Sequence, residues 1–151
     1  MASTLSNATL TVTVTESLTL NGAEHGSTKK MTIAGVNEVS KRIMTCATSP
    51  GTQIYRGASA ASFGTFVTAN VKYIRITNLD DTNSVILYFA NGVDHSFEYV
   101  LATGQVFMIT DTSASFDTAT TVAGFSGEDI TRIDAMGVGG TVDVEILVAS
   151  A

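Results

Sequence analysis

Strict alternation of apolar and polar side chains is the feature that most constrains the fold of this chain. From Thr9 to Thr15, every even-numbered residue is Leu or Val and every odd-numbered residue is Thr. Residues 142–148 show the same period, with Val or Ile at each even-numbered position. A period of two places these apolar side chains on one face of an extended strand. Both segments are therefore predicted to be β-strands with one buried face.

Further short strands, separated by turn residues, are expected along the rest of the chain. The expected strands cover residues 17–20, 29–34, 72–77, 84–90, 96–101 and 105–110. Turns are expected at Asn21-Gly22, Ser49-Pro50-Gly51 and Asn91-Gly92, because Gly and Asn tolerate positive φ and Pro presets a turn. Such spacing is typical of a β-sandwich or β-barrel.

The clearest pairing predicted from the sequence is a hairpin. Lys72–Thr77 and Ser84–Ala90 would be its strands, and residues 78–83 would be its turn. The second strand reads Val-Ile-Leu-Tyr-Phe, which favours burial on both faces. Because parallel pairs need long crossover connections, the close spacing of these strands predicts an antiparallel meander.

Three segments have ambiguous patterns. Val36–Ala47 fits both helical and alternating spacing, and its content of Val, Ile, Thr and Cys favours a strand. Asp111–Gly127 has weak periodicity and fits a loop or a short helix. Glu128–Met136 fits either a helical turn or a strand.

The length of 151 residues fits one domain. Charged residues make up 15% of the chain, against about 25% in ordinary globular domains. Thr, Ser, Gly and Ala replace them, and this mixture favours strands and turns over surface helices. We expect a single antiparallel β-sandwich over residues 1–151, with a short N-terminal arm at about residues 1–8.

The net charge of −6 argues against binding to nucleic acid, since that affinity comes largely from Lys and Arg. No segment approaches the roughly 20 apolar residues of a membrane-spanning helix. Residues 1–7 lack the basic start and apolar run of a secretory signal, so we expect no Sec export. Cys46 is the single cysteine, which excludes an intrachain disulfide.

No combination of residues predicts an enzyme. His25 and His95 both lie next to turn residues, and we interpret both as solvated. Asp94 and His95 are adjacent, so a strand would send their side chains to opposite faces. Cys46 fits a small buried side chain better than a nucleophile. A hydrolase would need one of the two histidines, since acid–base and covalent catalysis need a positioned base.

Two glycine-containing segments resemble catalytic or cofactor-binding motifs only in part. Gly124-Phe125-Ser126-Gly127-Glu128 lacks the last glycine of a nucleophile elbow. Gly137-Val138-Gly139-Gly140 lacks the glycine spacing of a dinucleotide site and the lysine of a phosphate-binding loop. The second segment is therefore predicted to be a turn, and no cofactor is expected.

Asp80, Asp81 and Asn83 place three oxygen-bearing side chains in one predicted turn, as calcium requires. The glycine and the later bidentate carboxylate of a calcium loop do not follow. Asp and Asn are also common in turns because their side chains bind local backbone groups. We expect that local role, and no metal site.

The aromatic residues cluster in the central strands and are expected to fill the core. They are Tyr73, Tyr88, Phe89, Phe97, Tyr99 and Phe107. A carbohydrate-binding β-sandwich is an alternative, in which an exposed Tyr73 or Tyr99 would stack on a sugar. The absence of Trp weakens that alternative.

Three segments of the chain resemble small virion structural proteins of tailed bacteriophages. They are Lys72–Asp80, the return strand Ser84–Phe89, and the C-terminal Val144–Ser150. These segments contain 22 of the 151 residues. It implies a capsid decoration (cement) protein with a jelly-roll-like sandwich, often a homotrimer, seated on the major capsid protein of a virion made in the host cytoplasm. It implies no catalytic residues.

The function expected from the sequence is therefore that of a homo-oligomeric virion structural protein, most specifically a capsid decoration protein. A phage tail component, such as a fibre, adaptor or tail-tube domain, is the alternative in the same class.

Overall fold

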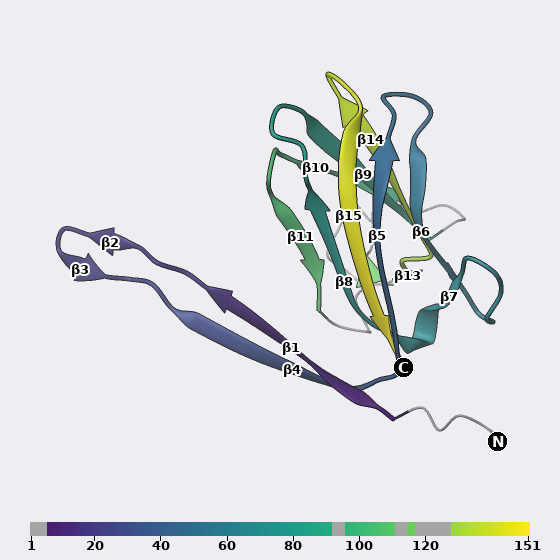
Figure 1. Cartoon of the computed structure of the whole chain (residues 1–151), viewed down its shortest axis with the longest axis horizontal. Helices are drawn as coiled ribbons and strands as arrows, with labels where there is room; N and C mark the ends of the chain where they lie inside the picture. Colours follow the sequence, from purple (N-terminus) through teal and green to yellow (C-terminus); the bar gives the residue numbers. More distant parts are fainter. Residues whose placement is uncertain (1–5, 92–95, 111–114, 117–127) are drawn as a thin grey trace, which may run out of the picture.

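The computed structural model describes residues 6–91, 96–110, 115–116 and 128–151. Two antiparallel sheets pack face to face, and a long β-hairpin projects from them (Figure 1). The five-stranded sheet contains β10 (Ser96–Leu101), β9 (Ser84–Ala90), β14 (Arg132–Val138), β6 (Thr52–Ala58) and β7 (Phe66–Val67), in that order. The four-stranded sheet contains β11 (Val106–Ile109), β8 (Val71–Asn78), β15 (Val142–Ser150) and β5 (Glu38–Cys46). The all-β sandwich predicted from the sequence is confirmed.

The strand order is that of a jelly roll. Apart from the short β7, which pairs parallel to β6, each sheet has four strands. Within them the first strand pairs with the last and the second with the next to last, as β5–β15 and β6–β14. The third and fourth follow the same rule, as β8–β11 and β9–β10. This nested pairing is the double-sheet winding of a jelly roll, which agrees with the expected fold.

The predicted hairpin of Lys72–Thr77 with Ser84–Ala90 is wrong. β8 pairs with β11 and β15, whereas β9 pairs with β10 and β14 in the opposite sheet. The connection over residues 79–83 therefore crosses between the sheets instead of turning within one. The simple meander is wrong for the same reason, although β9 and β10 do form a hairpin. Period-two patterns identify strands, but they do not identify which strand is the partner.

The core lies between the two sheets and is formed by their inward-facing side chains. Its largest fully buried side chains are Ile54, Tyr55, Ile76, Val85, Leu87, Phe89, Leu101, Ile133, Val142, Val144, Ile146 and Val148. Phe89 stacks on Phe97 with ring centroids 4.6 Å apart and contacts Phe107 at 5.0 Å. The expected aromatic core is confirmed for these three rings. It is wrong for Tyr73, which belongs to a second cluster, and for Tyr99, which is 43% exposed.

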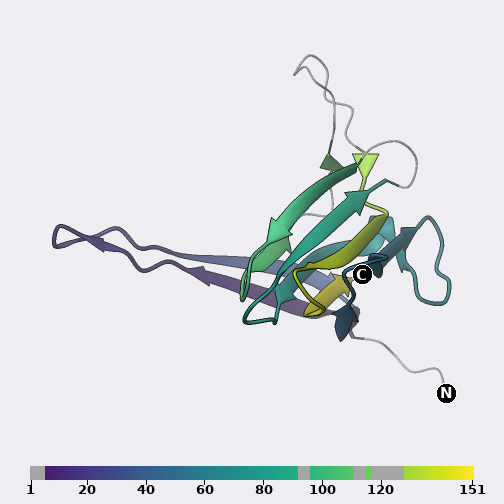
Figure 2. The same cartoon turned by 90° about the horizontal axis from the view of Figure 1, so that it is seen from above.

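The projecting hairpin, called the arm below, runs from Ala8 to Val36. Its long strands are β1 (Ala8–Thr15) and β4 (Thr28–Val36), and its tip contains β2 (Thr19–Leu20) and β3 (Ala23–Glu24). Asn21 and Gly22 form the predicted turn at the tip, with φ of 51° and 79°. Seen from above, the arm extends well beyond the sandwich (Figure 2). Of the short arm expected at residues 1–8, residues 1–5 lie outside the described residues. The projecting hairpin begins at Ala8 and was not predicted from the sequence.

The ambiguous segments are also strands where the structure describes them. Val36–Ala47 contains β5, as expected, and Glu128–Met136 contains β13 (Glu128–Asp129) and most of β14. From residues 111–127, the structure describes only β12 (Ser115–Phe116), which pairs with β13. Thr68–Asn70 forms one turn of 3-10 helix before β8. In the described ranges no helix has the length and apolar character needed to cross a membrane.

Candidate functional site

The sequence candidates for catalysis do not form one site in the described part of the chain. His25 is exposed and follows β3 at the tip of the arm, whereas Cys46 ends β5 in the core (Figure 1). Cys46 is fully buried, and this burial raises the pKa of its thiol to about 11. His95 and residues 124–127 lie outside the described residues. Cys46 therefore occupies the buried structural position predicted for it.

Of the glycine segment 137–140, predicted to be a turn, Gly137 and Val138 end β14, and Gly139 and Gly140 lie in the connection to β15. Gly139 has φ of +87°, a conformation that favours glycine. A Cβ at Gly137 would lie 2.2 Å from the carbonyl oxygen of Gly140. The glycines are therefore explained by close backbone packing.

The Asp80 carboxylate binds local backbone. Its Oδ1 accepts hydrogen bonds from the N–H groups of Thr82 at 2.8 Å and Asn83 at 2.6 Å. These bonds, the one from Asn83 foremost, lower the pKa of Asp80. Nowhere in the residues described do three His, Cys, Asp or Glu side chains gather closely enough to hold a metal ion. The Asp80 turn thus has the hydrogen bonding expected of a structural turn.

The two tyrosines proposed as sugar-stacking residues have different environments. Tyr73 is only 4% exposed, so the expectation of an exposed ring is wrong for this residue. It is buried because the base of the arm covers the outer face of β8. Tyr99 is 43% exposed, but its ring packs against Phe107 at a centroid distance of 5.1 Å. Of the two tyrosines, Tyr99 alone is exposed as the carbohydrate-binding alternative requires.

The candidate interaction site is the region where the arm meets the outer face of the four-stranded sheet. A second apolar cluster lies there, separate from the main core. Its buried members are Val36, Tyr73 and Ala149, and Leu10, Val12, Ile33 and Leu147 pack against them. The base of the arm is therefore held by apolar contacts to β8 and β15.

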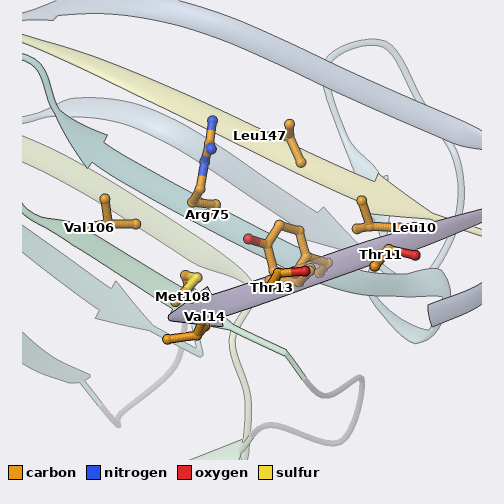
Figure 3. A pocket seen from close by; sticks show the side chains of 10 residues that line it. Leu10, Thr11, Thr13, Val14, Arg75, Val106, Met108 and Leu147 are labelled. Atoms are coloured by element: carbon orange, nitrogen blue, oxygen red, sulfur yellow. The ribbon is translucent and has the colours of Figure 1, made fainter. Parts of the chain in front are cut away.

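An open gap of about 440 Å³ lies between β1 and the sheet, and members of this cluster line part of it (Figure 3). Leu10, Val12 and Val14 of β1 line one side of it. The other side is formed by Tyr73, Arg75, Val106, Met108 and Leu147. Val106 is 47% exposed and Met108 is 38% exposed. The gap is thus an apolar space that one copy of the chain leaves unfilled.

A charged group borders the gap on the sheet. Glu145 forms ion pairs with Lys41, at 3.0 Å, and with Arg75. The hydrogen bond from Lys41 is the largest cause of a lowered Glu145 pKa. The Arg75 Nε is buried and finds no acceptor within the described residues. One donor beside the gap therefore has unused hydrogen-bonding capacity.

Two features of the arm remain uncovered. Leu18 and Leu20, near its tip, are each 56% exposed. None of the residues of β1 is fully buried, and within the described chain β1 pairs with β4 alone. The sequence carried a sign of this surface, because Leu18 and Leu20 resume the even-numbered apolar row of β1 after the interruption at Glu16. The contribution of Val106 and Met108 to the same region was not predicted.

Comparisons with protein-family models, with curated proteins and with solved structures found no match to this chain. The functional assignment therefore rests on the geometry of the arm and the sheet.

Proposed function

We propose that this chain is a homo-oligomeric virion structural protein, most specifically a capsid decoration protein that stabilises a shell by packing against it and against its own copies. The observation that carries the proposal is the arm, which projects a row of apolar side chains away from a sandwich that already has a complete core.

An isolated two-stranded hairpin is marginally stable in water. Among the described residues, this arm is anchored at its base, where Leu10, Val12 and Ile33 contact the outer face of the four-stranded sheet. Its distal half presents Leu18 and Leu20 to solvent. Contact with another protein subunit would bury this surface and stabilise the extended conformation, which is the reason to assign the arm to assembly.

The sandwich supports the same proposal by analogy of fold. Jelly rolls occur in viral capsid domains as well as in lectins and cupins, so the fold alone does not select among them. A virion role also agrees with the resemblance of β8, β9 and β15 to small virion structural proteins of tailed phages. A decoration protein acts by mass action, because each bound copy stabilises the assembled shell relative to the free subunits.

Immunogold electron microscopy tests the proposal. An antibody against the purified chain is applied to purified particles from the virus or lysogen that encodes it. Labelling of the capsid surface supports a decoration protein, and labelling of the tail supports the alternative of a tail component, whose subunits would use the same arm. Particles that lack the chain altogether contradict both.

A further inference from the structure

The free edge of β1 is unprotected against pairing with another strand. Protein edge strands are usually blunted by charged residues, by proline or by a covering element. Ala8–Thr15 contains no charged residue and no proline, and its outer edge has no partner strand in the described chain. Alternating Thr and Val also favour strand pairing strongly. An edge of this kind requires a partner strand to avoid indiscriminate association.

We infer that this partner strand is β1 of a second copy, paired antiparallel, so that the tip of each arm enters the gap beside the arm of the other. The inference deepens the proposed function, on which it rests, by naming the contact through which copies assemble. Such an interface is two-fold and isologous, because each copy contributes the same surface.

The alternation in β1 makes this pairing self-complementary. When even-numbered residues of one copy lie opposite even-numbered residues of the other, the Leu and Val side chains of β1 lie on one face and its threonines on the other. Glu16, which follows β1 in the even-numbered row, is the one charged residue between Val14 and Leu18. Val–Val and Thr–Thr pairs across strands are favourable. A slip of one residue would place Thr opposite Val, which favours the even registers.

The gap selects among the even registers. A partner tip that reaches the gap brings its Leu18 or Leu20 opposite Leu10 of the first copy. The two-fold axis then passes at Val14 in the first case and at Thr15 in the second. In both cases apolar tip side chains approach the end of the gap that Leu10 and Leu147 line, and the middle of the partner's β1 lies on the side of Val14 and Met108 (Figure 3). The two sandwiches lie at opposite ends of the paired arms.

Charge favours a second copy as the occupant. The arm carries Glu16, Glu24, Lys29 and Lys30, so the net charge of −6 falls on the rest of the chain. The arm is therefore where two copies meet with least repulsion. Each copy contributes β1 and the tip of the arm, and the sheet residues that line the gap add to this contact.

Mass by light scattering provides the first test. The wild-type chain is expected to be a dimer, or an assembly of dimers. The double variant Leu18→Ser, Leu20→Ser is expected to weaken self-association on the order of a hundredfold, since four half-exposed leucines per dimer lose their apolar contacts. Val100→Ser is the matched control, because Val100 is 61% exposed on β10, away from the arm. Its dimer should be unchanged.

Engineered cysteines provide the second test and do not depend on the stability of the leucine variants. Residues that face themselves across an antiparallel two-fold axis have Cα atoms about 4.5–5.5 Å apart, within disulfide range. Mild oxidation should therefore crosslink Val14→Cys or Thr15→Cys between copies. Thr32→Cys, an exposed position on β4, is the control and should stay uncrosslinked. The native Cys46 is fully buried and should not interfere.

A monomer or trimer of the wild-type chain, or equal crosslinking at residues 14, 15 and 32, would overturn the inference. A trimer would instead agree with the assembly expected from the resemblance to decoration proteins. These outcomes can be told apart from those of the immunogold experiment. If the chain is found on particles but associates without β1, the proposed function stands and the proposed β1 interface is wrong.

Discussion

The sandwich and the arm are built from the same alternating strands, yet they satisfy their apolar faces differently. In the sandwich, the inward faces of two sheets cover each other, and side chains such as Ile76, Leu87 and Val144 are fully buried. In the arm, Leu10, Val12 and Val14 are only partly buried, and Leu18 and Leu20 are more than half exposed. One pattern of residues therefore produces a self-sufficient core where a second sheet covers it and an open surface where none does.

The largest expected effect comes from the centre of the sandwich. Phe89→Ala should lower the free energy of unfolding by about 3–5 kcal/mol, because it leaves a cavity where Phe89 packs against Phe97 and Phe107. Val14→Ala, in the arm, should lower it by less than about 1 kcal/mol, since Val14 is only partly buried. Urea denaturation of both variants, at a concentration where the chain is monomeric, measures the difference. Equal losses would contradict the proposed distinction between the two regions.

The next largest effect concerns the crossing between the sheets. Asn78 is fully buried, and its Nδ2 donates to the carbonyl oxygens of Asn83, Leu101 and Ala102. Its Oδ1 accepts the N–H of Asp80 at 3.0 Å. Asn78→Ala leaves these groups without that partner, and we expect a loss of about 3 kcal/mol in thermal or urea unfolding.

Asn37→Ala is the control for this substitution, because Asn37 is exposed between the arm and β5. It should leave stability nearly unchanged. If Asn78→Ala is as stable as this control, the side-chain bonds of Asn78 do not hold the crossing in place.

A smaller effect is expected at the tip of the arm. Gly22 has φ of +79°, which an alanine adopts at a cost of about 1 kcal/mol. Gly22→Ala should speed amide hydrogen exchange in β2 and β3 and leave exchange in β14 and β15 unchanged. Faster exchange in the sandwich strands as well would show that the arm and the sandwich open together.

The smallest expected effect is electrostatic. The folded-state pKa of Glu145 is lowered, chiefly by the hydrogen bond from Lys41, so its ion pairs contribute stability above the ordinary pKa of about 4.5. That contribution is lost as the pH falls below this value and through the lower folded pKa. The stability difference between wild type and Glu145→Gln should therefore be present at pH 7 and shrink towards pH 3. A difference independent of pH would contradict this role of the carboxylate.

Much of the local structure followed from the residues. Alternation identified β1, β8 and β15, and the Asn21-Gly22 turn was correctly located because its backbone needs positive φ. The inward row of β15, including Val144 and Ile146, was also identified. The partner of β8 was not, since the residues of the turn 78–83 do not reveal that Asn78 bonds to Leu101 and Ala102 and thereby directs the chain into the other sheet.

The candidate site, too, was predicted from the sequence only in part. The apolar residues at even-numbered positions from Leu10 to Leu20, interrupted by Glu16, are evident in the sequence, whereas their exposure depends on where the arm points. Tyr73 has the pattern of an outward-facing residue on β8, and only the base of the arm, through Leu10 and Ile33, makes it buried. Val106 and Met108 become part of the site because β11 pairs with β8 beneath the arm.

The sequence by itself determined which residues form strands and which side of each strand is apolar, because side-chain alternation is a local property of an extended backbone. The tertiary structure decided which strands pair, which faces are covered, and that the first hairpin lies outside the sandwich. Those outcomes depend on contacts between residues far apart in the chain, and a period-two pattern carries no information about them.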